Sequence, residues 1–229
     1  MLVRWFEDPS VMGYRFGSLR DWGSSAALRL AFAAAIALTS SVTQAFTATI
    51  TAGSRQLYLQ VGNGSFTGTY NAGGTPQNNA TINVVSVTVP AASVGNGVAQ
   101  AMTSNSTQAT SYYDGFAFCN PPAQVYIGGL YRAPGATGTA TLTATAPTSL
   151  TTAGGAAIPF TQIRWTSSGN SDTGTEVIPA GSFTGGTQTL ATFNVNTWDE
   201  SCHTFSYANT IVPAAGTFTG RVTYTLAAP

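Results

Sequence analysis

Hydrophobic and polar residues alternate with a period of two along most of the chain after residue 45. Residues 139–145, TATLTAT, place Ala140, Leu142 and Ala144 on one face and threonines on the other. Strict alternation with β-branched residues is the signature of a half-buried strand. The segments 56–61, 84–89 and 220–226 alternate in the same way, and glycine- and proline-containing turns separate them. We therefore expect an all-β domain of many short strands, arranged as an antiparallel β-sandwich.

The alternation also assigns each strand residue to a face. In segment 56–61 we expect the three aliphatic side chains to point into the core and the three others to point to solvent. The aliphatic residues are Leu57, Leu59 and Val61, and the others are Gln56, Tyr58 and Gln60.

The pentapeptide Gly-Ser/Thr-Phe-Thr-Gly occurs three times, beginning at Gly64, Gly181 and Gly216. In each copy we expect the phenylalanine to pack inward and the second glycine to share its face, with the strand continuing from that point. Glycine in a strand marks a bend or a close approach by another element, so these glycines could leave room for a neighbour's strand. The anchors and their glycines are Phe66 and Gly68, Phe183 and Gly185, and Phe218 and Gly220.

The first 45 residues have a different character. Arg29 lies within the segment LRLAFAAAIAL, and the small-residue stretch TQA ends at Ala45. A basic flank, a short apolar run and small residues before a cut are typical of a secretory signal peptide. The run is shorter than the about 20 residues that a membrane span needs. We predict a cleavable signal peptide over residues 1–45, a single domain over 46–229 and no stable membrane span after cleavage.

Charge is scarce in the predicted domain. Residues 46–229 contain no lysine, four arginines and five acidic residues, far below the charged share of about a quarter in an average globular chain. Binding to nucleic acid or to anionic lipid requires a basic stripe, so the sequence excludes both partners. Uncharged polar residues must cover the surface, which suits a secreted protein or a subunit that packs against copies of itself.

Cys119 and Cys202 are the only two cysteines of the chain. An even number of cysteines in an exported chain predicts a disulfide. Closing so long a loop would stabilise the fold by about 4–5 kcal/mol in the chain-entropy model. Because the chain has a single histidine and its cysteines are expected to be paired, we expect neither a zinc site nor a cofactor.

Two clusters suggest other functions. Residues 111–132 hold six aromatic side chains; we expect Phe116 and Phe118 to face the core, while exposed rings would form a protein interface or stack on sugars. The segment WDESCH holds Asp199, Glu200 and His203, the atoms that a hydrolase would need. Cys202 and His203 are successive strand residues that point to opposite faces and so do not form a nucleophilic pair; we predict no catalytic residue and no enzyme. The six aromatic residues are Tyr112, Tyr113, Phe116, Phe118, Tyr126 and Tyr131.

The segment FTATITA at the start of the predicted domain alternates Phe46, Ala48, Ile50 and Ala52 against threonines. Together with the signal peptide, the low charge and the cysteine pair, it resembles the secreted pilin-type subunits of bacterial chaperone–usher fibres. In that family the domain is an Ig-like sandwich, and an N-terminal extension completes the sheet of the neighbouring subunit. Such an added strand needs backbone hydrogen bonds and pockets for alternate side chains. An ordinary first strand within its own domain is the other interpretation of this segment.

The resemblance implies a structural subunit of an extracellular fibre or surface layer, with residues 46–54 as the donor strand. Its partners would be copies of itself or related subunits, with a periplasmic chaperone as a further partner. The alternative is a monomeric secreted adhesin or carbohydrate-binding module that uses exposed aromatic residues. In either case the resemblance implies a secreted protein at the cell surface.

Overall fold

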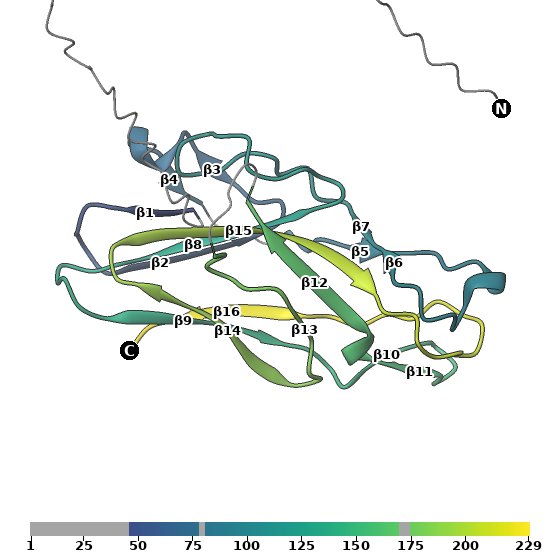
Figure 1. Cartoon of the computed structure of the whole chain (residues 1–229). Helices are drawn as coiled ribbons and strands as arrows, with labels where there is room; N and C mark the ends of the chain where they lie inside the picture. Colours follow the sequence, from purple (N-terminus) through teal and green to yellow (C-terminus); the bar gives the residue numbers. More distant parts are fainter. Residues whose placement is uncertain (1–45, 78–80, 170–174) are drawn as a thin grey trace, which may run out of the picture. The chain divides into compact units, whose positions relative to one another are not determined.

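Antiparallel strands make up most of the regular structure in the computed structural model, which describes residues 46–77, 81–169 and 175–229 (Figure 1). The predicted signal peptide, residues 1–45, lies outside the described residues. The described residues belong to one compact unit, and its two main sheets pack as a β-sandwich, as the alternation predicts. Helical structure in these ranges is limited to three 3-10 turns, at Tyr70–Ala72, Ala91–Ser93 and Phe160–Gln162.

The larger sheet is organised around its longest strand, β15 (Thr197–Tyr207). The first half of β15 pairs with β8 (Val125–Arg132) on one edge, and the second half pairs with β12 (Ile163–Ser168) on the other. Beyond these lie β2 (Gln56–Val61), next to β8, and β13 (Gly181–Ser182), next to β12. The free edges of these two halves are partly covered: Thr197–Asp199 also pair with β1 (Thr47–Thr49), and Ser206 and Tyr207 also pair with β6 (Gln100–Ala101).

The smaller sheet contains β14 (Thr187–Asn194), β9 (Thr139–Thr145) and β16 (Thr223–Ala227), in that order. A β-bulge in β14 shifts the register between Thr189 and Ala191. Three pairs of very short strands complete the fold. They are β3 (Phe66–Thr67) with β4 (Thr75–Pro76), β5 (Val85–Ser86) with β7 (Thr103–Ser104), and β10 (Ser149–Thr151) with β11 (Ala157–Pro159).

The main core lies between the two sheets. Ala140, Leu142 and Ala144 of β9 are fully buried, as their alternation predicts, and they share a cluster with Ile127 of β8 and Trp165 of β12. The predicted strand 84–89 is shorter in the structure, where only β5 is paired. Its valines at positions 85, 87 and 89 nevertheless pack against this core.

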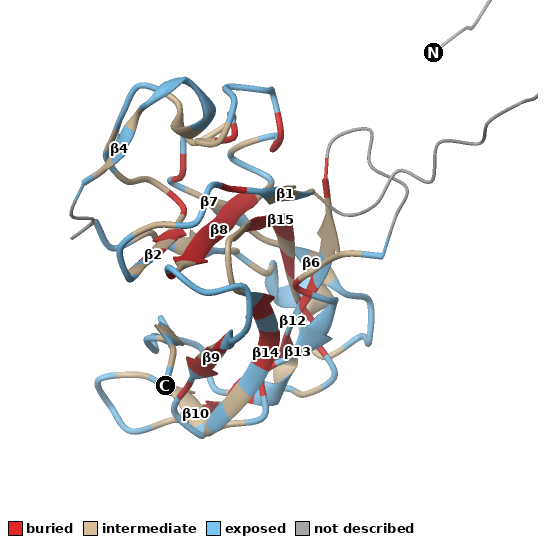
Figure 2. Cartoon of the chain, turned by 90° about the vertical axis from the view of Figure 1, so that its left-hand side faces the viewer, coloured by how far each residue is buried: buried red, intermediate tan, exposed pale blue. Residues whose placement is uncertain are grey.

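A layer of loops covers the other face of the larger sheet, so β8 and β15 are buried along nearly their whole length (Figures 1 and 2). Phe66, Tyr70 and Tyr112 of these loops pack on Tyr58 and Trp198 of the sheet. The prediction for the faces of β2 is therefore wrong at three positions: Tyr58 and Gln60 are 7% and 0% exposed, whereas Leu57, expected in the core, is 42% exposed. The loop layer, which alternation within one strand does not reveal, covers Tyr58 and Gln60 and keeps them from solvent.

Candidate functional site

The segment predicted to be a donor strand lies in a sheet of its own chain. β1 pairs with β15 in an antiparallel register that places Thr47 opposite Asp199 and Thr49 opposite Thr197. Just outside the ladder, the Ile50 amide donates to the Asn196 carbonyl at 2.9 Å. Within a single chain, residues 46–52 therefore behave as an ordinary first strand of their own domain, the second of the two interpretations of FTATITA. Within the described residues, β15 is the only strand that pairs with β1, which therefore occupies an edge of the sheet.

Alternate side chains of β1 pack into the aromatic layer. The Phe46 ring meets the rings of Tyr113 and Phe118 edge-on, each with a centroid distance of 5.7 Å. Ala48 lies in the same layer, and Ile50 is 5% exposed. Ala52, predicted as the fourth inserted residue, lies beyond the strand and is exposed.

We call the surface that holds β1 the β1 groove. It consists of the backbone edge of residues 196–200 and the rings of Tyr113 and Phe118. Asn196 shapes one end of it: its φ of 59° is left-handed, a conformation that asparagine tolerates. Its side chain is fixed by hydrogen bonds with the Ala133 amide and the Gly135 carbonyl. This groove was not predicted from the sequence, because it brings together two distant parts of the chain, one around Tyr113 and Phe118 and the other at residues 196–200.

A buried carboxylate lies directly beside β1. Asp199 is 3% exposed and accepts hydrogen bonds from the hydroxyl of Thr47 at 3.0 Å and from that of Thr197 at 2.6 Å. Burial raises the pKa of Asp199, and the two hydroxyls only partly oppose this change. Through Thr47, β1 therefore supplies one of the two hydrogen bonds that replace water around this buried carboxyl group.

Glu200 points to the opposite face of β15, under the loop layer, and is fully buried. Its Oε2 accepts hydrogen bonds from the Tyr126 hydroxyl at 2.5 Å and from Trp198 Nε1 at 3.0 Å. Burial raises the pKa of Glu200 to about 7, although Ser111, Tyr126 and Trp198 favour the charged form. The carboxyl group therefore titrates near neutral pH in the folded protein.

The disulfide Cys119–Cys202 fastens the loop layer to β15, with a Cα–Cα distance of 5.6 Å. The predicted pairing is confirmed. Phe118 and Tyr126 pack around the bridge and are at most 2% exposed. Phe46 of β1 packs against the same cluster, so the bridge stabilises the part of the layer that forms the β1 groove.

Asp199, Glu200 and His203 do not form a catalytic arrangement. Asp199 and His203 share a face of β15 but are separated by four residues, or about 13 Å of strand. Glu200 lies on the other face. His203 is fully buried and stacks on Trp165 with a centroid distance of 5.6 Å. Burial lowers the pKa of His203 to about 3, so its imidazole is neutral.

The aromatic segment 111–132 forms packing contacts and no continuous exposed platform. Phe118, Tyr126 and Tyr131 are at most 3% exposed, and Tyr112 and Tyr113 are half-buried in the loop layer. The prediction for Phe118 is confirmed. The prediction for Phe116 is wrong: its side chain is 48% exposed, because it lies in a tight loop closed by the hydrogen bond from the Ser111 amide to the Phe116 carbonyl.

The three Gly-x-Phe-Thr-Gly copies lie in different surroundings. Phe66 stacks on Tyr112 in the loop layer, whereas Phe183 is 2% exposed in the main core and Phe218 packs at its border. Gly68 and Gly185 have φ angles of 71° and 74°. Each follows a short strand that has already ended, so the prediction that the strand continues there is wrong for these two copies.

The space beside these glycines is occupied by the chain itself. A Cβ atom on Gly220 would lie 2.7 Å from Phe160 and 2.8 Å from Leu150, and one on Gly185 would lie 3.1 Å from the Thr148 backbone. Gly68 approaches Gly74, whose Cα would be 3.4 Å away. Close packing within the domain therefore accounts for glycine at positions 185 and 220, and the left-handed φ angle favours glycine at position 68.

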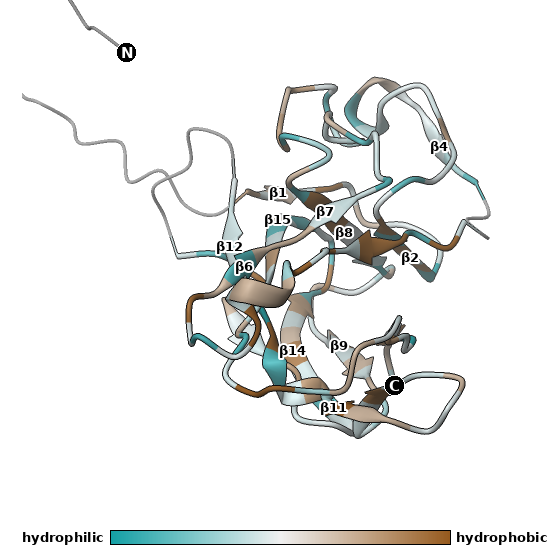
Figure 3. Ribbon diagram, turned by 90° about the vertical axis from the view of Figure 1, so that its right-hand side faces the viewer, coloured by the Kyte–Doolittle hydropathy of each residue, from teal (hydrophilic) through white to brown (hydrophobic). Residues whose placement is uncertain are grey.

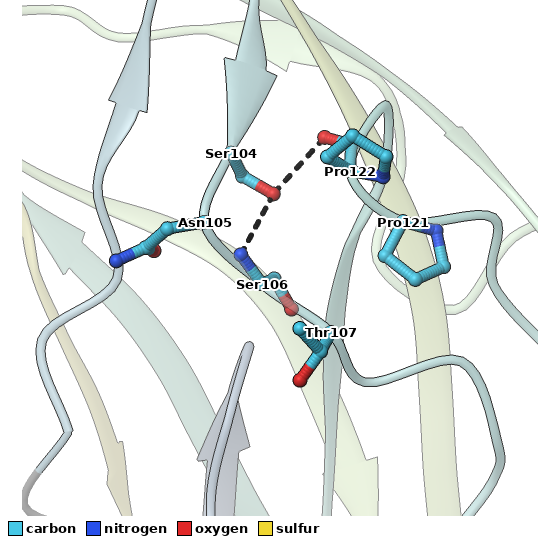
Figure 4. A pocket seen from close by; sticks show the side chains of 6 residues that line it. All are labelled: Ser104, Asn105, Ser106, Thr107, Pro121 and Pro122. Atoms are coloured by element: carbon cyan, nitrogen blue, oxygen red, sulfur yellow. Dashed lines mark hydrogen bonds between the residues drawn. The ribbon is translucent and has the colours of Figure 1, made fainter.

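A shallow hollow lies beside the loop layer and is lined by Ser104, Asn105, Ser106, Thr107, Pro121 and Pro122 (Figure 4). The Ser104 hydroxyl donates to the Pro122 carbonyl at 3.0 Å and accepts from the Ser106 amide at 3.2 Å. The Thr107 amide and hydroxyl both bond to Asn63 Oδ1. No titratable side chain lines the hollow, and these polar groups serve the fold, so it offers no acid–base chemistry.

No protein-family model, no curated protein and no solved structure matches this chain. Among the described residues there is no group of three or more histidine, cysteine and acidic side chains that could hold a metal ion. In the same ranges, no helix has the length and hydropathy that a membrane crossing requires. The β1 groove is thus the candidate site that the geometry defines best.

Proposed function

We propose that this chain is a structural subunit of an extracellular fibre or surface layer, and that β1 passes between copies to link them. The observation that carries the proposal is the way in which β1 is held. Phe46, Ala48 and Ile50 insert as alternate side chains while the backbone pairs with β15. Backbone pairing combined with pockets for alternate residues is the physical basis of recognition by strand addition.

The connection between β1 and β2 is suited to act as a hinge. Thr51, Ala52 and Ser54 are exposed. Two backbone contacts hold the connection: the Gly53 amide donates to the Ala133 carbonyl at 3.3 Å, and Arg132 Nε donates to the Ser54 carbonyl at 3.3 Å. Exchange of β1 would replace contacts within one chain by the same contacts between two chains. Protein concentration and hinge conformation would then decide between monomer and polymer.

An Ig-like sandwich, export and a non-enzymatic role are parts of the same proposal. The Cys119–Cys202 bridge supports export, since structural disulfides persist in oxidising compartments. The resemblance of the sequence to pilin-type subunits supports assembly with copies or related subunits. A periplasmic chaperone would fit this scheme by covering the β1 groove before assembly. The alternative, a sugar-binding adhesin, has weaker support because all of its proposed aromatic residues except Phe116 are buried or half-buried.

Negative-stain microscopy of the exported protein tests the proposal, with a variant that lacks residues 46–54 and two point variants of β1. Ile50→Asp places a charge in the β1 groove, whereas Thr49→Asp places it on the exposed side of the same strand. We expect filaments for the wild type and for Thr49→Asp, and none for the deletion or for Ile50→Asp.

Circular dichroism on the same samples separates loss of assembly from loss of folding. If the deletion variant is folded, a synthetic peptide of residues 46–54 should bind to it, and a peptide carrying the Ile50→Asp change should not. Filaments that persist without residues 46–54, or monodisperse particles in every sample, would refute strand exchange.

A further inference from the structure

The outer face of the smaller sheet is an array of threonines in register across three strands. The central row consists of Thr189 of β14, Thr143 of β9 and Thr225 of β16. The next row consists of Thr187, Thr145 and Thr223, and a further row contains Thr192, Thr141 and Ala227. Residues that lie directly opposite one another share a face, so these side chains form one surface. All of them are exposed or half-buried.

Most of the hydroxyl groups on this face are free to bind something outside the chain. Within the described residues, the Thr145 and Thr187 hydroxyls bond to each other at 2.8 Å, and the Thr143 hydroxyl reaches the Thr225 carbonyl at 3.4 Å. The other threonines of the array have no side-chain hydrogen bond there; they are Thr141, Thr189, Thr192, Thr223 and Thr225.

The face carries no charge within the three strands, and the nearest charge along the chain is Arg221, two residues before β16. Figure 3 shows β14 in alternating pale and brown bands and β9 in pale colours, without a strongly hydrophilic stretch on β9. An uncharged face gives a charged partner nothing to pair with. Its partner is therefore neutral and able to donate as well as accept hydrogen bonds.

The array is periodic in two directions. Adjacent strands lie about 4.8 Å apart, and alternate residues of β9, of β16 and of β14 before its bulge repeat at about 6.8 Å. The bulge separates Thr192 from Thr189 by three residues, so the regular part of the array consists of the central row and the row of Thr187. Threonine is β-branched, so its χ1 angle is stiff and its methyl and hydroxyl groups hold fixed positions. The face thus presents two regular rows of methyl and hydroxyl groups, which run across β14, β9 and β16 (Figure 1).

We infer that this threonine face binds ice. Ice is neutral, its surface oxygens repeat in two directions, and each water molecule both donates and accepts hydrogen bonds. The methyl groups restrict the orientation of first-shell water, and the hydroxyls anchor that water to the protein. The face has no aromatic ring of the kind that stacks on crystalline polysaccharide, and stacking on a second copy would bury many hydroxyl groups with few good partners.

The twist of the sheet determines the kind of activity that we expect. Neighbouring strands rotate by about 20–25°, so three strands match a flat lattice over only a few repeats. Such a face holds small crystal steps and slows recrystallisation at low protein concentration, and it depresses the freezing point little. The inference does not depend on exchange of β1, which lies in the other sheet.

The test measures inhibition of ice recrystallisation by the exported protein and by variants of the central row. Thr143→Ser, Thr189→Ser and Thr225→Ser together keep the hydroxyls and remove the ordering methyl groups. We expect the concentration needed for inhibition to rise about tenfold, equivalent to about 1.4 kcal/mol of lost binding. Thr143→Lys in the same row should abolish inhibition. The matched control Thr88→Lys changes an exposed threonine outside the array and should inhibit like the wild type.

Circular dichroism must show that each variant is folded before its result is interpreted. Absence of inhibition by the folded wild type at any soluble concentration would overturn the inference. Equal inhibition by the wild type and Thr143→Lys would also overturn it, because another surface would then bind the ice. If Thr143→Lys instead abolished sedimentation with crystalline cellulose or abolished self-association, with no effect on ice, the face would belong to that partner.

Discussion

The two sheets of the sandwich differ in what covers them. The smaller sheet buries one face in the core and leaves the other to water, so β9 alternates between buried alanine or leucine and more exposed threonine. The larger sheet is buried on both faces, because an aromatic loop layer lies over β8 and β15 (Figure 2). The open face of the smaller sheet can serve as a binding surface. The covered larger sheet instead offers the β1 groove at its edge, where a strand can be exchanged.

The largest effect should come from removing the bridge that fastens the loop layer. Replacing Cys119 and Cys202 together by alanine should lower the free energy of unfolding by about 4–5 kcal/mol, the value for a closed loop of this length. Urea titration followed by circular dichroism measures the change. An unchanged midpoint would show that the loop layer is held without its covalent link.

Single substitutions on opposite faces should separate the two sheets. In the larger sheet, Ile127→Ala and Leu130→Ala remove fully buried side chains that belong to clusters on opposite faces, so each should cost about 2–5 kcal/mol. In the smaller sheet, Leu142→Ala should cost a similar amount. Thr143→Val, on its outer face, should change stability by no more than about 0.5 kcal/mol.

Urea midpoints of these four variants form one experiment. A small cost for Leu130→Ala would mean that the loop layer packs loosely on the sheet. A large cost for Thr143→Val would mean that the hydrogen bond from the Thr143 hydroxyl to the Thr225 carbonyl stabilises the sheet.

Two buried titratable residues, Glu200 and His203, should change the stability with pH in opposite directions. Glu200 ionises near pH 7 in the folded protein and at 4.5 in an unfolded chain, so between these values the folded state holds one more proton and stability falls as the pH rises. His203 is protonated at 6.5 when unfolded and only near 3 when folded, so below pH 6.5 its effect on stability has the opposite sign. Between pH 4.5 and 6.5 the two effects nearly cancel in the wild type.

Removing either titratable group should reveal the pH dependence that the other one causes. Over the two units from pH 6.5 to 4.5, Glu200→Gln should lose about 3 kcal/mol of stability, and His203→Phe should gain about 3 kcal/mol, at about 1.4 kcal/mol per unit. Asp199, whose pKa is also raised, acts in the same direction as Glu200 at the acid end. Identical pH profiles in the two variants would contradict the burial of these groups.

The sequence correctly predicted those features of the fold that depend only on a single strand or on a single pair of residues. The faces of Ala140, Leu142 and Ala144, the bounds of β2 and the pairing of Cys119 with Cys202 all followed from local pattern and compartment. It was insufficient where a third layer intervenes. Gln60 looks solvent-facing in an isolated strand, but it bonds to Tyr58 and to the Gly62 carbonyl beneath the loops.

The candidate site was predictable only in part. The alternation of Phe46, Ala48 and Ile50 indicated a strand that inserts every second side chain, and these three residues are inserted in the structure. The groove that receives them is made by Asn196, Tyr113 and Phe118, whose proximity depends on tertiary contacts over 83 residues. The repeated Gly-x-Phe-Thr-Gly motif led to a wrong prediction of continuing strands, because its three copies lie in different surroundings.

The most direct test of strand exchange is a covalent trap across the β1–β15 pairing. Thr49 and Thr197 are directly opposite, and opposite residues of antiparallel strands have Cβ atoms about 4.5–5.5 Å apart, close enough for a disulfide to form with a small adjustment. The Thr49→Cys, Thr197→Cys protein is allowed to assemble, is then oxidised, and is run on a non-reducing denaturing gel. Exchange of β1 predicts a ladder of covalent oligomers that collapses to monomer on reduction. A single monomer band from assembled material, with the new bridge formed within each chain, would contradict it.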